Sequence, residues 1–227
     1  MADDGNSDEL YQAVRTVVRR RKTTKVLSLL EQPPTTDTDR TQHGDAMLRQ
    51  CIDDAGWAPF HFDRHVDEIA EPWRVHWLKQ NACRRVASQL GEWFTDLKPG
   101  NKMPALLVAC GSVVLVTWIP QTSTEIGDAQ KLVGINEEHL AATAAYVQNL
   151  LLLLEARGLA SYWSSGSLFK TPIGFEKLGI PTDQRLLACI FVDYSPFDTS
   201  RTVEIAGGGQ RAKRTPSAKW TREIEIA

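Results

Sequence analysis

The sequence lacks the local patterns that identify several common protein classes. Its four cysteines, Cys51, Cys83, Cys110 and Cys189, form no CxxC pair, so a zinc ribbon and a thioredoxin-type motif are excluded. Scattered cysteines of this kind are typical of buried, reduced thiols in a cytoplasmic protein. An excess of one charge is also lacking, because the formal net charge is only −2. The whole molecule therefore offers no electrostatic reason to bind nucleic acid or an anionic membrane.

No long hydrophobic run is present either. The most apolar stretch, residues 105–119, is too short for a membrane span and is interrupted by Gly111 and Ser112, so we expect it in the core. The first nine residues are acidic and polar, so we expect no signal peptide and a cytoplasmic protein. A length of 227 residues with 42% hydrophobic and 24% charged residues predicts a single domain over 1–227. Residues 1–8 are expected to be a disordered amino terminus and residues 200–227 a carboxy-terminal arm.

Hydrophobic periodicity predicts helices and strands in an irregular order, which favours an α+β fold over a doubly wound sheet. Three cap residues are expected at helix starts, namely Asp45, Asn81 and Asn136, and Gly158 is expected just after the longest helix. Residues 31–44 read as a polar loop and 207–209 as a flexible turn. The predicted helices are 7–21, one beginning after Asp45 and ending before Pro59, one from Asn81 to about Leu97, 137–157 and a short one from Thr171-Pro172 to Gly179; the predicted strands are 74–79, 113–118 and 185–194.

A basic run follows the first predicted helix. Arg21-Lys22-Thr23-Thr24-Lys25 places cations and hydroxyls within a few residues. A guanidinium can grip a phosphate with two hydrogen bonds, and the hydroxyls and ammonium groups can complete the site. The alternative is a solvated basic helix end, because cations are favoured at a helix carboxy terminus.

Two further stretches could place backbone groups against a flat ligand. The first comprises the rigid turns Ala58-Pro59 and Pro72-Trp73 around a polar excursion. The second is the small-residue loop 158–166, where backbone amides could approach a ring system closely. Each has an ordinary alternative, a helix stop before a strand for the first and a helix–strand connection for the second.

These three stretches, taken in order, resemble the FMN-dependent nitroreductase family from the first helix to Arg214. The family's Arg-x-Ser-x-Arg element is similar to Arg21–Lys25, and its Ala-Pro-Ser…Gln-Pro-Trp element is similar to Ala58-Pro59-Phe60…Glu71-Pro72-Trp73. Its Asn-Leu…Gly-Leu-Gly…Trp-x-x-Gly element resembles Asn149-Leu150…Gly158-Leu159-Ala160…Trp163-Ser164-Ser165-Gly166.

The resemblance implies an FMN site. Arg21, Lys22, Thr23 and Lys25 would bind the phosphate, ribityl chain and pyrimidine edge, with Arg214 as a further phosphate cation. Pro59 and Phe60 would touch the isoalloxazine ring from the partner subunit. The backbone amides of Ser165 and Gly166 would point at flavin N5, where a donor stabilises reduced flavin.

The resemblance also implies the architecture and the activity. The expected fold is a mixed sheet flanked by helices, in a homodimer that packs through helix 137–157 and exchanges its carboxy-terminal arms. The expected activity transfers hydride from NAD(P)H through FMN to a small electron-poor substrate, such as a nitroaromatic or a quinone, with no catalytic side chain because the flavin carries the chemistry.

Two other functions stay open, the first because of departures from the family pattern. Phe60 replaces a small polar residue, the stretch to Pro72 is long, and Glu71 and Asp193 replace Gln and Gly. A non-catalytic protein that binds flavin or a partner is therefore an alternative. A metal enzyme using His61 and His65 is a second one, because histidines at i and i+4 of a helix could share a metal. No GxSxG elbow or P-loop is present.

Overall fold

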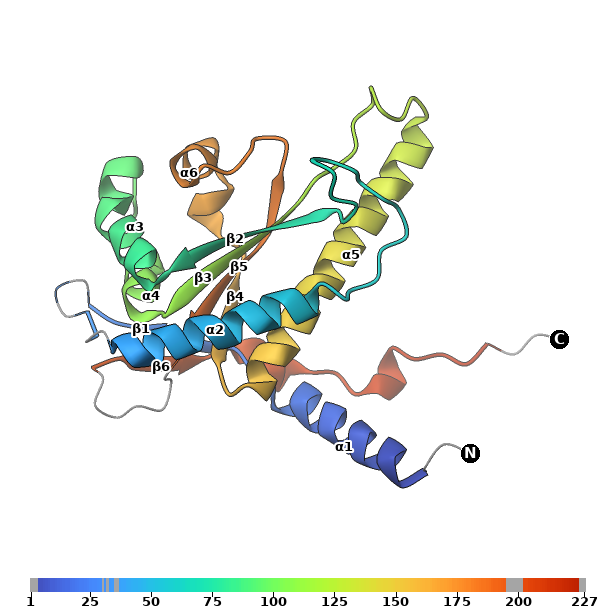
Figure 1. Cartoon of the computed structure of the whole chain (residues 1–227), viewed down its shortest axis with the longest axis horizontal. Helices are drawn as coiled ribbons and strands as arrows, with labels where there is room; N and C mark the ends of the chain where they lie inside the picture. Colours follow the sequence, from blue (N-terminus) through green and yellow to red (C-terminus); the bar gives the residue numbers. More distant parts are fainter. Residues whose placement is uncertain (1–3, 30, 32, 35–36, 195–201, 225–227) are drawn as a thin grey trace.

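The computed structural model of the chain describes residues 4–29, 31, 33–34, 37–194 and 202–224. Helices and strands are intermixed along the chain, as an α+β fold requires (Figure 1). The helices are α1 (Asp4–Arg20), α2 (Thr38–Ala55), α3 (Gln80–Trp93), α4 (Met103–Ala109), α5 (Ala129–Ala156) and α6 (Pro172–Leu178), with three 3₁₀ turns, η1 (Ser167–Lys170), η2 (Gly209–Lys213) and η3 (Ser217–Lys219). The strands are β1 (Thr24–Leu27), β2 (Trp73–Lys79), β3 (Ser112–Trp118), β4 (Ala160–Ser164), β5 (Arg185–Asp193) and β6 (Glu204–Gly207).

A four-stranded sheet with the order β2-β3-β5-β4 forms the centre of the molecule. Every neighbouring pair in it runs antiparallel. The prediction of a mixed sheet is therefore wrong for the described strands. Side-chain patterning identifies a buried strand but not its direction, which is decided by the strands that lie beside it.

The sheet is covered on both faces, and β3 shows why. Val113 and Leu115 point into a core formed with α3, α4 and α6, whereas Val114 and Val116 point into a second core formed with α2 and α5. Successive side chains of a strand face opposite ways, so a strand covered on both faces is apolar along most of its length. The predicted strand 113–118 is confirmed on this ground.

The longest helix begins earlier than predicted. The Asp128 side chain caps α5 by accepting from the Lys131 backbone amide at 2.9 Å, so the assignment of Asn136 as the cap is wrong. Asn136 instead lies within α5, where its side chain bonds both backbone groups of Gln121. The apolar centre of α5 is buried as expected, and Gly158 follows the helix with a left-handed φ of 72°.

Two other predicted caps are also wrong. Helix α2 starts at Thr38, with Asp37 accepting from the Arg40 amide at 3.0 Å, so Asp45 lies inside the helix and much of the predicted loop 31–44 is helical. Helix α3 starts one residue before Asn81. The short helix α6 is confirmed at both ends, where Thr171 caps its start and Gly179 its end. Of the predicted arm 200–227, residues 202–224 are described, whereas 200–201 and 225–227 lie outside the described residues.

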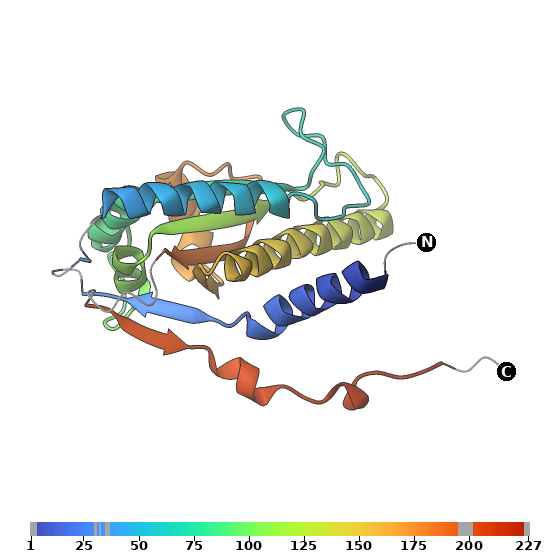
Figure 2. The same cartoon turned by 60° about the horizontal axis from the view of Figure 1, so that its bottom comes forward.

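A second sheet ties the two ends of the chain together. Strands β1 and β6 pair antiparallel, with Thr24 opposite Gly207 and Leu27 opposite Glu204. Gly207 therefore belongs to a strand, and the flexible turn expected at 207–209 is wrong there. The tail beyond β6 runs beside α1 in Figure 2 and is exposed along its described length. Within the described residues, no helix has the length and hydropathy needed to cross a membrane.

Candidate functional site

A cleft of about 870 Å³ opens where α1 ends and the β1–β6 sheet begins. It brings together five residues that the sequence singled out, Arg21, Lys22, Thr23, Lys25 and Arg214. The remaining lining comes from the end of α1, from α5, from β4 and from the tail. These residues are Val18, Arg19, Gln148, Tyr162, Trp163, Gly207, Gly208, Gly209, Gln210 and Arg211.

The charged side chains that line this cleft are all positive. Six cationic side chains line the cleft and no aspartate or glutamate does, although the chain as a whole carries a net charge of −2. None of the six makes an ion pair with a carboxylate of the described residues. Like charges gathered without counterions repel one another, so the cleft is suited to an anionic ligand. The six are Arg19, Arg21, Lys22, Lys25, Arg211 and Arg214.

Local structure explains how the basic run reaches the cleft. The Arg21 amide donates to the Val17 carbonyl at 2.9 Å, the last bond of the α1 ladder. The chain then extends into β1, where Lys25 carries its ammonium 4.7 Å from the centre of the Tyr162 ring. Tyr162 is itself stacked on Phe191 of the central sheet at 5.9 Å. The cation–π contact and the stack hold Lys25 against the main domain.

Ser165 and Gly166 do not line the cleft. Gly166 has a left-handed φ of 74°, and its amide donates to the Ser164 hydroxyl at 3.2 Å. A Cβ there would lie 2.8 Å from the Leu186 side chain, so glycine is required by both conformation and space. The role of these amides at flavin N5 stays a prediction, and it requires the Gly166 amide to exchange this partner.

Pro59 and Phe60 also lie away from the cleft. Phe60 packs edge-on against Trp73, with ring centres 5.7 Å apart. The neighbouring Trp57 side chain is 89% exposed. The contact of Pro59 and Phe60 with a flavin bound to a partner subunit stays a prediction.

The long segment between Phe60 and Glu71 is held down by Arg64. Its guanidinium makes a two-pronged ion pair with Glu125 at 2.7 and 3.2 Å and donates to the carbonyls of Ile119 and Pro120. Beneath it His139 of α5 is buried, and burial followed by the charge of Arg64 lowers the His139 pKa.

The structure does not place His61 and His65 as the metal-enzyme alternative requires. The segment that carries His61 and His65 is not helical, and His65 has a positive φ of 45°, so the two rings are not one helical turn apart. Among the described residues, no three His, Cys, Asp or Glu side chains gather in a way that could hold a metal ion.

The four cysteines are buried and free, as the sequence predicted. Burial raises the pKa of the Cys51 thiol to about 11, and burial also raises the pKa of the Cys110 and Cys189 thiols. Neutral buried thiols are poor nucleophiles, so the structure gives these three cysteines a packing role.

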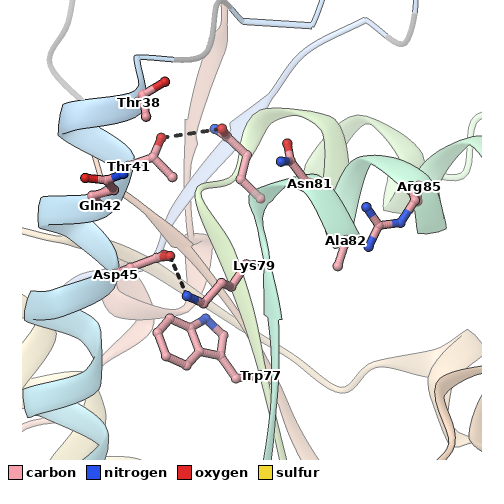
Figure 3. Close-up of a pocket in the computed structure, with 10 residues that line it drawn as sticks. Thr38, Thr41, Gln42, Asp45, Trp77, Lys79, Asn81, Ala82 and Arg85 are labelled. Atoms are coloured by element: carbon pink, nitrogen blue, oxygen red, sulfur yellow. Dashed lines mark hydrogen bonds and ion pairs between the residues drawn. The ribbon is translucent and has the colours of Figure 1, made fainter.

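A second cavity, of about 540 Å³, lies between α2 and the start of α3 (Figure 3). Lys79 pairs with Asp45 at 3.2 Å at its floor. Behind it the Tyr194 hydroxyl lies 2.7 Å from Asp45 and 2.6 Å from the Ser112 hydroxyl, which accepts from the Trp77 indole at 2.9 Å. Since an indole only donates and a carboxylate only accepts, the order of donation is fixed from Trp77 through Ser112 and Tyr194 to Asp45. This network joins α2 to the central sheet.

Sequence reasoning missed several residues of the first cleft. Gln148 and Tyr162 lie in or beside the stretches compared with the family but were not assigned as ligands, because they reach the cleft only through the packing of α5 and β4. Arg211 lies in the predicted carboxy-terminal arm, where the family resemblance pointed to Arg214 alone among the cations.

The comparisons with known proteins agree with this architecture. A family model described as the nitroreductase family matches residues 39–192. A nitroreductase-like family protein from Bacillus cereus is 23% identical, with 94% of this chain and 96% of that chain covered and a TM-score of 0.65. A protein described as a nitroreductase in complex with FMN, from Desulfovibrio desulfuricans, is 15% identical over 94% and 98% of the two chains, with a TM-score of 0.56.

A third solved structure is that of an FMN- and NADPH-dependent nitroreductase from a Sphingopyxis strain. It is 13% identical over 79% of this chain and 87% of that chain, with a TM-score of 0.51. At such identities the likeness establishes the fold alone, whereas the family model matches more than half of the chain. The chain belongs to the nitroreductase family.

Proposed function

We propose that this protein is an oxidoreductase that binds FMN in the cationic cleft. The observation that carries the proposal is the set of six cationic side chains around a cleft without a carboxylate, at the place where the sequence resembles the family's phosphate-binding element. The Desulfovibrio and Sphingopyxis relatives, whose names mention FMN, support the same cofactor.

The residues present fit such a cofactor. A phosphate needs strong donors, and Arg21, Lys22 and Arg214 supply charged ones beside the hydroxyl of Thr23. The volume of about 870 Å³ is within the range of roughly 300–1,000 Å³ in which proteins bind small ligands. Gln148 and Tyr162 offer an amide and a ring to the same cleft.

Lys25 has a separate task in this proposal. When bound, the flavin would supply hydride chemistry, accepting from NAD(P)H and reducing a flat, electron-poor compound such as a nitroaromatic or a quinone. Lys25 would lie at the pyrimidine edge, where its charge favours the negative charge of reduced flavin. Its contact with Tyr162 at 4.7 Å orients the ammonium without neutralising it. No side chain of this chain is assigned a proton transfer.

We further propose that two chains associate. Apolar side chains of α1 form a stripe that its own chain leaves open to solvent, with Leu10, Tyr11, Val14 and Val18 each at least half exposed. In the tail, Trp220 and Ile224 are 65% and 78% exposed. A surface of this kind is typical of a protein–protein interface. On α5, the helix through which the resemblance implies packing, Val133 and Leu140 are 55% and 38% exposed, so α5 could share the contact with α1 and the tail. Arm exchange, the single-domain boundaries and the cytoplasmic location stay predictions.

The visible absorption spectrum of the purified protein tests the cofactor. After incubation with FMN and removal of the excess, a band near 450 nm (about the value for oxidised flavin) is expected, and its absence would remove the proposal. Flavin that binds but is not reduced by NADH or NADPH would instead support the second candidate, a non-catalytic flavin protein. The observation favouring that candidate is the segment after Phe60, which Arg64 fastens over α5.

A further inference from the structure

The carboxy-terminal tail is fastened to the end of α1 by Arg211. Its guanidinium donates to the backbone carbonyls of Arg21, at 2.5 Å, and of Arg20, at 3.5 Å, and also to the carbonyl of Arg19. A helix leaves its last carbonyls without amide partners, and these lie at the negative end of the helix dipole. Arg211 therefore caps α1 from a position 190 residues further along the chain.

Two more contacts join the tail to the same short segment. Thr24 pairs with Gly207 in the β1–β6 sheet. A Cβ on Gly208 would lie 2.9 Å from the Thr23 side chain, so the tail backbone touches Thr23 at a distance that only glycine allows. The carbonyl of Arg21, the side chain of Thr23 and the backbone of Thr24 are thus all contacted by the tail.

Charge makes such a fastening necessary. The tail brings Arg211 and Arg214 into a cleft that already holds four other cations. Their mutual repulsion would push the tail away unless another attraction opposes it. The carbonyl oxygens at the end of α1 provide that attraction, and the planar guanidinium can donate to several of them at once, which an ammonium does less well.

We infer that Arg211 is a positioning residue, which holds the tail on α1 and so fixes Arg21, Thr23, Lys25 and Arg214 relative to one another around the ligand. The attachment follows from the contacts alone. Its consequence for flavin rests on the proposed function.

The attachment is tested without cofactor by hydrogen exchange and mass spectrometry on the full-length protein. In Arg211→Ala we expect faster exchange in segments 21–27 and 202–210, and in Arg211→Lys an intermediate rate. Arg222→Ala is the matched control, because Arg222 is an exposed arginine of the same tail outside the cleft. Exchange in Arg211→Ala equal to that of the wild type would overturn the inference. If that variant does not fold, Gly208→Ala displaces the tail without changing its charge and should accelerate the same segments.

The consequence for the cofactor is tested with FMN and with riboflavin, which lacks the phosphate. A positioning residue affects every side chain that it holds in place around the cleft, so Arg211→Ala should weaken the binding of both FMN and riboflavin. We expect FMN affinity to fall by about tenfold, which corresponds to about 1.4 kcal/mol. It should also make the reduction potential of bound FMN more negative, because Lys25 is displaced. Weaker FMN binding with unchanged riboflavin affinity and unchanged exchange would show a direct phosphate contact and overturn the positioning role. If the wild-type protein binds neither FMN nor riboflavin, the proposed function is rejected. The attachment of the tail to α1 is still supported in that case, provided that hydrogen exchange depends on Arg211.

Discussion

Replacing Gly44 by alanine should destabilise this protein, although Gly44 lies within a helix. A Cβ at this position would lie 2.3 Å from the Tyr194 ring, far inside van der Waals contact. Overpacking of this kind costs about 1–3 kcal/mol. Replacing glycine by alanine in a helix interior contributes about 0.5–1 kcal/mol of stability. The net loss expected for Gly44→Ala is therefore up to about 2.5 kcal/mol, with a further loss if the Tyr194 hydroxyl leaves Asp45 and Ser112.

Without the Tyr194 ring, Gly44→Ala should stabilise the protein instead of destabilising it. In a Tyr194→Ala background, the clash is gone and Gly44→Ala should stabilise by up to about 1 kcal/mol through the helix preference alone. Urea denaturation, monitored by circular dichroism, measures the effect of Gly44→Ala in both backgrounds. The four proteins compared are the wild type, Gly44→Ala, Tyr194→Ala and the double variant.

A second pair of variants protects this test against a background that does not fold. A Cβ on Gly111 would lie 2.6 Å from the same ring, so Gly111→Ala and Gly44→Ala should be less than additive once the ring has moved. Equal effects of Gly44→Ala with and without Tyr194, or strict additivity with Gly111→Ala, would refute the argument.

Three other variants probe the cleft and the segment above α5. Arg21→Ala should lower FMN affinity by about 2–3 kcal/mol through loss of a charge-assisted contact, measured by fluorescence titration, and an unchanged Kd would reject the assignment of Arg21. Gly166→Val should reduce both flavin loading and stability, because the new side chain meets Leu186 in a left-handed backbone; normal loading would count against this glycine's place beside the flavin. His139 has a lowered pKa, so its neutral form is favoured in the folded state. The contribution of neutral His139 to the free energy of unfolding is complete above about pH 6.5, the pKa of histidine in the unfolded chain. This contribution decreases as the pH falls below that value. Urea midpoints at pH 7.5 and about 5.5 should therefore differ more in the wild type than in His139→Leu, and parallel behaviour of the two proteins would contradict this reading.

Parts of the fold with strong local signals could be predicted from the sequence. The short helix α6 begins and ends where predicted, because Thr171, Pro172 and Gly179 act on their immediate neighbours. Strand β3 was recognised because both of its faces are apolar. The α+β class followed from the order of these segments, and the basic run from Arg21 to Lys25 proved to line a cleft.

The tertiary structure decided which of several equivalent local signals is used. Asp45, Asn81 and Asn136 are as suitable for helix caps as Asp37 or Asp128, but the first and last of them are engaged elsewhere, Asp45 with Tyr194 and Asn136 with Gln121. The four-residue strands β1 and β6 have no stability of their own and exist only as a pair.

The cleft depends on the same long-range pairing. It unites residues near position 21 with Tyr162 and with Arg211 and Arg214, and this union is decided by strand pairing and by the capping of α1. The amino-acid sequence by itself determined which side chains could bind a phosphate, because charge and hydrogen-bonding capacity belong to each residue. Only the tertiary structure decided which of them meet, because that depends on the free energy of contacts between segments far apart in the chain.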